Sequence, residues 1–145
     1  MRLKISVSNV ILALATAMLF GCQSTPPQEE LKSFDYGPQP ENYEQIVRDY
    51  LAPKLNDKAN ATISFKAGPK KLYQPYSVAV DQVWGWGVCV MVNDKNPLGI
   101  YGGVRPVVLF IRNGKVVSAN NAQGWEPVGS GYAKKGCSEL GYEVP

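Results

Sequence analysis

The segment from Val78 to Asn93 constrains the fold more than any other part of this sequence, because its side chains alternate with a period of two. Large apolar residues fall on one face (Trp84, Trp86, Val88, Val90 and Val92), and smaller or more flexible ones fall on the other (Gly85, Gly87, Cys89 and Met91). Successive side chains of a strand point to opposite faces of its sheet. The alternation therefore predicts a long β-strand, with the two glycines leaving room for close approach of a helix or loop.

A short strand is expected before this segment. Apolar and polar residues alternate over residues 63–67, and the turn signal Gly68-Pro69 follows. Residues 69–77 carry no such alternation and are expected to form a loop.

A hairpin is expected after it. Residues 94–103 are predicted to form a loop, and Val104–Arg112 is an apolar strand. Asn113-Gly114 favours a type I′ turn, because both central residues of that turn need a positive φ. The partner strand is expected at Lys115–Ala119, whereas residues 120–136 show no clear period.

One helix is predicted on the N-terminal side of the strands. Its apolar stripe recurs every three or four residues (Tyr43, Ile46, Val47, Tyr50, Leu51 and Leu55). Asn42 is expected to cap the helix, with the Gln45 side chain reaching back to the cap residue. Pro53 is expected to break or kink the helix at residues 52–53. Together these patterns predict an α+β fold in which one N-terminal helix packs on an antiparallel sheet of three or four strands. A single domain is expected over residues 41–145.

The first 21 residues read as an export signal, which leaves 145 − 21 = 124 residues for the mature chain. A short, positively charged N-terminal segment, Met1–Lys4, precedes an apolar stretch from Val7 to Phe20. This stretch is shorter than the ~20 apolar residues that a permanent membrane-spanning helix needs. A transmembrane anchor is therefore the less favoured alternative.

The signal ends in Leu19-Phe20-Gly21-Cys22, which resembles the bacterial lipobox. The resemblance implies that Cys22 receives a diacylglyceryl group on its thiol, becomes the first residue, and is acylated on its new amine. Three acyl chains anchor a protein far more firmly than one. The residue after Cys22 is Gln23, whereas an Asp at this position would favour retention in the inner membrane. We therefore expect the protein to be anchored in the periplasmic leaflet of the outer membrane.

Residues 22–40 are expected to form a flexible, Pro-rich tether after the lipidated cysteine. Once Arg2 and Lys4 leave with the signal, 13 basic residues face 12 acidic ones, a net charge of +1. That balance removes the main support for nucleic acid as a partner. The lysine pairs at residues 70–71 and 134–135 are expected to be solvated loop charges, with weak attraction to lipid headgroups as the alternative.

Cys89 and Cys137 are the two cysteines that remain after Cys22. An even pair in an oxidising compartment predicts one disulfide. The alternative, catalytic or metal-binding thiols, lacks a CxxC spacing, a histidine base and a third ligand. The chain contains no histidine, which excludes Ser-His-Asp and Cys-His mechanisms. We therefore expect no metal, no cofactor and no enzymatic activity.

Several aromatic residues are candidates for contact with a partner. Tyr73, Tyr76, Tyr101 and Trp125 lie in or beside expected loops, where aromatic side chains stack on sugars or anchor a protein. Trp84 and Trp86 are expected to belong to the core instead. The spacing Gly131-x-x-x-x-Gly136 lacks the lysine, strand and helix of a phosphate-binding loop.

Three segments together resemble a known group of proteins: PENYEQIVRDYL (40–51), GWGVCVMVNDKN (85–96) and YGGVRPVVLFIRNGKVV (101–117). They are similar to small proteobacterial outer-membrane lipoproteins that share this helix start, this strand and a Phe-Leu-Ile-Arg-x-Gly hairpin. The resemblance covers residues 36–117 and implies a shared fold without an activity; Pro53 and residues 58–62 depart from the pattern.

The expected function is that of a lipid-anchored, non-catalytic envelope protein that binds another envelope protein or peptidoglycan. Two narrower alternatives stay open. The chain could inhibit a cell-wall hydrolase through the loop at residues 94–103, or it could be a structural accessory subunit of an outer-membrane or secretion machine.

Overall fold

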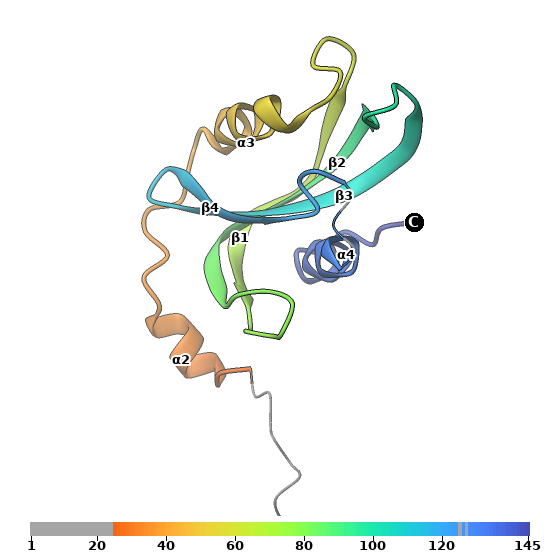
Figure 1. The fold of residues 1–145 in the computed structure, drawn as a ribbon. Coiled ribbons are helices and arrows are strands. Elements are labelled where there is room, and N and C mark those ends of the chain that lie inside the picture. Colours follow the sequence, from red (N-terminus) through yellow and green to blue (C-terminus); the bar gives the residue numbers. More distant parts are fainter. Residues whose placement is uncertain (1–24, 125, 127) are drawn as a thin grey trace, which may run out of the picture.

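The computed structural model describes residues 25–124, 126 and 128–145, which form one antiparallel sheet with a helix on each face (Figure 1). The sheet has four strands in the order of the sequence: β1 (Thr62–Gln74), β2 (Val83–Lys95), β3 (Tyr101–Arg112) and β4 (Lys115–Asn120). The helices are α2 (Gln28–Ser33), α3 (Tyr43–Leu51) with the 3₁₀ turn η2 (Ala52–Lys54), and α4 (Gly129–Glu139). The predicted α+β class is confirmed.

The first core lies between α3 and one face of the sheet. Val88, Val90 and Val92 of β2 are completely buried there, as the alternation of this strand predicted. They pack with Val47 and Leu51 of α3. Full burial of each such side chain is worth about 1.5–3 kcal/mol, so this face holds α3 on the sheet.

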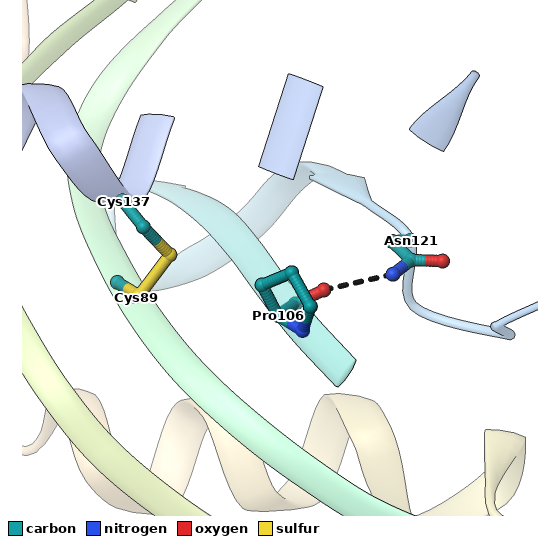
Figure 2. The surroundings of a disulfide bond; sticks show 4 residues. All are labelled: Cys89, Pro106, Asn121 and Cys137. Atoms are coloured by element: carbon teal, nitrogen blue, oxygen red, sulfur yellow. Dashed lines mark hydrogen bonds between the residues drawn. A yellow bond between two sulfur atoms is a disulfide. The ribbon is translucent and has the colours of Figure 1, made fainter. Parts of the chain in front are cut away.

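The second core lies on the opposite face, beneath α4. Cys89 alternates with the valines and points to this side, where it forms the predicted disulfide with Cys137 of α4 (Figure 2). Both cysteines are completely buried, together with Val108 and with Phe110, which is 1% exposed. The bridge therefore joins the centre of the sheet to the C-terminal helix.

Helix α4 differs from the sequence-based expectation, because residues 120–136 show no helical period. Its sequence GSGYAKKGCSE contains three glycines, which are poor helix formers. Packing replaces the missing propensity: Gly136 sits so close to β3 that a Cβ there would lie 3.0 Å from Cγ1 of Val108. A glycine at this point lets the helix backbone approach the strand, and the disulfide follows one residue later.

Strand β1 is longer than predicted and runs through the expected turn and loop. It passes the cis Gly68–Pro69 peptide with irregular register on both sides of Ala67, and continues to Gln74. Since β1 is an edge strand, a proline and a bulge cost it few ladder hydrogen bonds. Strand β2 begins at Val83, five residues later than expected, because residues 75–82 form the connection between the two strands.

Strand β3 begins at Tyr101 and contains Pro106 at its centre. Its pairing with β4 ends at Val108 and Asn120, so Pro106 lies beyond the last β4 pair. The side-chain amide of Asn121 donates to the Pro106 carbonyl at 2.9 Å in place of a strand (Figure 2). The β3–β4 turn has φ of 51° at Asn113 and 73° at Gly114, as a type I′ turn requires.

Helix α3 ends as predicted, since Pro53 falls in the 3₁₀ turn that follows Leu51. The expected N-terminal cap is wrong. Asn42 occupies the cap position without a side-chain hydrogen bond to the helix, and the Gln45 amide donates to the carboxylate of Asp49 at 2.7 Å instead of reaching back.

The N-terminal segment differs from the flexible tether expected over residues 22–40. Residues 28–33 form helix α2, and Tyr36 is only 5% exposed. The indole N–H groups of Trp84 and Trp86 donate to the carbonyls of Asp35 and Gly37. The folded domain therefore includes residues before residue 41, because the aromatic residues of this segment pack on the sheet.

Candidate functional site

Four large apolar side chains are exposed to solvent in and beside the turn between β2 and β3. They form the largest such group in the described part of the chain. We call residues 96–104 the hairpin tip. Leu98 is 83% exposed, Ile100 61%, Val104 58% and Tyr101 46%. Single exposed apolar residues are common, whereas a contiguous group on one turn makes that turn a candidate interaction surface.

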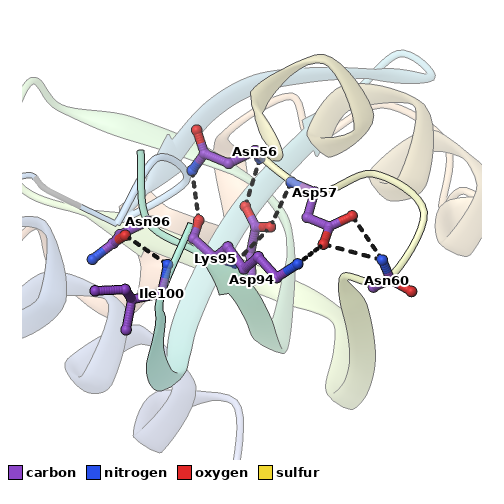
Figure 3. A network of polar contacts seen from close by, with 7 residues as sticks. All are labelled: Asn56, Asp57, Asn60, Asp94, Lys95, Asn96 and Ile100. Atoms are coloured by element: carbon purple, nitrogen blue, oxygen red, sulfur yellow. Dashed lines mark hydrogen bonds and ion pairs between the residues drawn. The ribbon is translucent and has the colours of Figure 1, made fainter. Parts of the chain in front are cut away.

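The backbone of the hairpin tip is held by Asn96. Its side-chain oxygen accepts a hydrogen bond from the backbone amide of Leu98 at 2.9 Å. It also accepts one from the backbone amide of Ile100 at 3.0 Å (Figure 3). The backbone N–H of Asn96 donates to the Ile100 carbonyl at 2.8 Å, and Gly99 supplies the positive φ that closes the turn. The apolar side chains therefore project from a turn that has its own hydrogen bonds.

A buried carboxylate anchors the hairpin tip to the connection between η2 and β1. Asp94 is 4% exposed and accepts from three backbone amides, those of Asn56 at 2.7 Å, Lys95 at 2.8 Å and Asp57 at 3.0 Å (Figure 3). The Asn56 side chain donates in return to the Lys95 carbonyl at 2.7 Å. Because the amides satisfy the charge of Asp94, this network fixes where β2 leaves the sheet.

An ion pair lies beside this carboxylate. Nζ of Lys95 is 2.6 Å from Oδ2 of Asp57. The hydrogen bond from Lys95, followed by that from Asn60, lowers the pKa of the Asp57 carboxyl below its usual 3.8. The same hydrogen bond raises the pKa of Lys95. Lys95 also lies over the Tyr101 ring, 5.4 Å from its centroid, which links the ion pair to the hairpin tip.

A cleft of about 400 Å³ opens at the foot of the hairpin tip, between η2 and the start of β3. Lys54 and Arg105 are the cations on its wall, besides the paired Lys95. The Arg105 guanidinium donates to the carbonyls of Asn121 and Ala122, and burial lowers its pKa. The cleft therefore has a basic border next to an apolar projection.

The structure separates the residues that the sequence singled out. Tyr101 lies in the hairpin tip. Tyr73 and Tyr76 lie at the other end of β1: Tyr73 packs against Phe34 with ring centroids 5.6 Å apart, and Tyr76 is 62% exposed. Trp125 and Cys22, like the signal at residues 1–21, lie outside the described residues. Of the three members of the predicted aromatic set that the structure describes, only Tyr101 thus belongs to this site.

Sequence reasoning missed the aliphatic members of the site, Leu98, Ile100 and Val104. A signal was present, because the loop sequence DKNPLGIYGG places two large aliphatic residues among turn formers, where no strand or helix pattern assigns them to a core.

Two further observations on the described residues concern metal binding and membrane crossing. Within residues 25–124, 126 and 128–145, no three Cys, Asp or Glu side chains gather in a way that could hold a metal ion. Over the same residues, no helix is long and apolar enough to cross a membrane.

Comparison with known proteins found no protein-family model, no curated protein and no solved structure that matches this chain.

Proposed function

We propose that this chain is a lipid-anchored envelope protein of the non-catalytic, binding type, which faces the periplasm and contacts a protein partner through the hairpin tip. One observation carries the proposal. Leu98, Ile100 and Tyr101 project from the sheet outside both cores, on a turn whose backbone is already hydrogen-bonded. A preorganised apolar projection binds with little loss of conformational entropy.

The charged groups near the hairpin tip support binding over catalysis. Asp94 accepts hydrogen bonds from three backbone amides, and Asp57 forms an ion pair with Lys95, so these groups stabilise the fold. Lys54 and Arg105 border the adjacent cleft. The best-fitting partner is therefore a protein with an apolar pocket for Leu98 and Ile100 and an acidic rim that faces the cleft.

The anchoring half of the proposal rests on the resemblance of residues 19–22 to a lipobox. It predicts that the mature protein starts at Cys22 and sediments with outer membranes, and that Cys22→Ser releases it. Recovery of the chain with Met1 intact in the cytosol would contradict it.

The binding half is tested by crosslinking in living cells. A photoreactive amino acid replaces Leu98 in the full chain, and a matched control carries it at Val117, an exposed apolar residue of β4 that is 42% accessible. We expect a discrete crosslinked protein from position 98 and none from position 117. Equal products at both positions, or none at either, would overturn the proposal.

The identity of the crosslinked protein chooses between the narrower functions. A cell-wall hydrolase would indicate an inhibitor, and a subunit of a membrane machine would indicate an accessory component. Leu98→Ser with Ile100→Ser should reduce crosslinking from a label at Tyr101 at least tenfold, about 1.4 kcal/mol of binding energy.

A further inference from the structure

The N-terminal end of the described chain and the β1–β2 loop lie at the same end of the sheet, away from the hairpin tip (Figure 1). The loop comprises residues 75–82. Thr25, where the described chain begins, lines one cleft of about 370 Å³ together with Pro75 of the loop. The two are therefore neighbours in space although 50 residues separate them.

Contacts with the sheet hold the N-terminal segment in this place. The Phe34 ring stacks on Trp84 with centroids 4.9 Å apart, and Tyr36 is buried under Lys71, whose Nζ lies 5.0 Å from the ring centroid. The Trp86 indole donates to the Gly37 carbonyl at 3.1 Å. These contacts consequently hold the segment that begins at Thr25 beside the loop.

The loop presents apolar side chains from a hydrogen-bonded frame. Val78 is 98% exposed and Tyr76 62%. Between them, the Ser77 hydroxyl accepts from the amides of Ala79 and Val80 and lies 2.6 Å from the Tyr132 hydroxyl of α4. At the base of the loop, the Gln74 side chain donates to the Asp81 carbonyl at 3.2 Å. Val78 thus points into water at the apex of a braced turn.

The length of chain before Thr25 decides what covers this apex. Only three residue steps separate Cys22 from Thr25, and they span at most about 10 Å. If Cys22 carries its lipid in the bilayer, the end of the domain that includes the loop lies against the same bilayer. A longer free tether would have allowed any orientation.

We propose that residues 75–82 contact the lipid bilayer, with Val78 and Tyr76 entering its interfacial region; this inference rests on the proposed lipidation of Cys22. Tyrosine favours the level of the headgroups, where its ring is in an apolar layer and its hydroxyl in water. Strand β2 separates this loop from the hairpin tip by up to about 40 Å of chain. The hairpin tip therefore faces away from the membrane, toward a partner in the periplasm.

The contact is apolar in origin and sets orientation, whereas the lipid sets attachment. Two side chains bury little surface, but the anchor keeps them at high local concentration next to the bilayer. Acidic and basic residues are mixed at this end, with Glu29 and Asp81 among the acids and Lys32 and Lys71 among the bases. We therefore expect the contact to change little between low and high salt.

The test uses the full, processed protein in vesicles of phosphatidylethanolamine and phosphatidylglycerol. A polarity-sensitive fluorophore is attached to Val78→Cys or to the matched control Leu98→Cys, two positions that are both exposed in the domain. The added thiol is the reactive one, because Cys89 and Cys137 form the disulfide and lipidation converts the Cys22 thiol to a thioether.

We expect the label at position 78 to shift to the blue and to be quenched severalfold more by spin-labelled lipid than the label at position 98. Equal quenching of the two labels on protein that floats with the vesicles would overturn the loop contact and leave the lipid anchor intact. Protein that does not float with the vesicles would overturn both. In a second variant, Tyr76→Ser should reduce the blue shift at position 78 without reducing flotation.

Discussion

The indole nitrogen of Trp86 lies 3.1 Å from the carbonyl oxygen of Gly37, 49 residues earlier in the chain, and so ties the N-terminal segment to the middle of the sheet. Trp84 makes the equivalent bond to Asp35 two residues away along both segments. The two tryptophans thus bind a segment of their own chain, and this contact fixes the position of the N-terminal segment on the sheet.

Replacement of Trp86 by Phe tests this contact. Trp86→Phe keeps an aromatic ring but removes the donor of a part-buried hydrogen bond, and should cost about 1 kcal/mol. Trp84→Phe, whose bond is exposed, should cost less. Urea denaturation gives the free energies, and hydrogen exchange should show faster exchange over residues 34–37 in Trp86→Phe. Unchanged exchange would argue against docking of this segment.

Gly87 is expected to tolerate no side chain. A Cβ at this position would lie 2.7 Å from Cβ of Leu72 and 3.2 Å from Cδ2 of Leu140. Gly87→Ala should therefore destabilise the fold by about 1–3 kcal/mol. Gly102→Ala is the matched control in a strand, because nothing lies within 4 Å of its Cβ. Similar urea midpoints for the two variants would disprove the close packing at Gly87.

Replacement of the buried carboxylate of Asp94 should destabilise the fold even when the new side chain has the same shape. Asp94→Asn places an amide group against backbone N–H donors at Asn56, Asp57 and Lys95, and should cost about 1.5–3 kcal/mol. Asp81→Asn, at an exposed position, should leave stability within about 0.5 kcal/mol. Denaturation curves of both variants decide the matter, and equal midpoints would show that the amides do not need the charge.

The Asp57–Lys95 pair should make stability depend on pH in the acid range. As the pH falls through about 4, Asp57 takes up a proton in the unfolded chain while the folded chain, with its lowered pKa, stays ionised. The stabilisation is therefore present above this range and is lost as the pH falls further.

The parent should thus be more stable than Asp57→Asn at pH 7, with the difference shrinking toward pH 3. Lys95→Met removes the main cause of the shift and should show the same loss of acid dependence. The parent's advantage over Lys95→Met should also fade above pH 10.5, as the pH rises through the raised pKa of Lys95. Denaturation at a series of pH values measures both; parallel curves for parent and variants would refute the coupling.

The disulfide should supply a large share of the stability. It joins residues 48 apart, which corresponds to ~4 kcal/mol in the chain-entropy description. Cys89→Ala with Cys137→Ala should therefore lower the free energy of unfolding by at least this amount. Cys22→Ser, which keeps the bridge, should leave the urea midpoint unchanged. A double variant as stable as the parent would mean that packing alone holds α4 on the sheet.

Much of this architecture follows from local pattern. The alternation along β2, the type I′ turn at Asn113-Gly114 and the end of the helix before Pro53 were each predicted, because each depends on the side chains of a few neighbouring residues. The pairing of Cys89 with Cys137 followed from their number and the expected compartment.

Other elements depend on contacts that no local pattern records. Helix α4 has a glycine-rich sequence and exists because Gly136 lies against Val108 and Cys137 bonds to the sheet. Strand β1 continues through a proline because it lies at the edge. The hairpin tip is recognisable as a site only once Leu98, Ile100 and Val104 are known to lie outside both cores.

The sequence by itself determined the alternation of β2, the turn between β3 and β4, the end of helix α3 and the chemistry that the absence of histidine excludes, because periodicity and residue type act over short distances. The tertiary structure alone decided which apolar side chains remain in water and where the N-terminal segment lies. Exposure and docking depend on residues far apart in the chain, such as Trp86 and Gly37, whose proximity arises only when the sheet has formed.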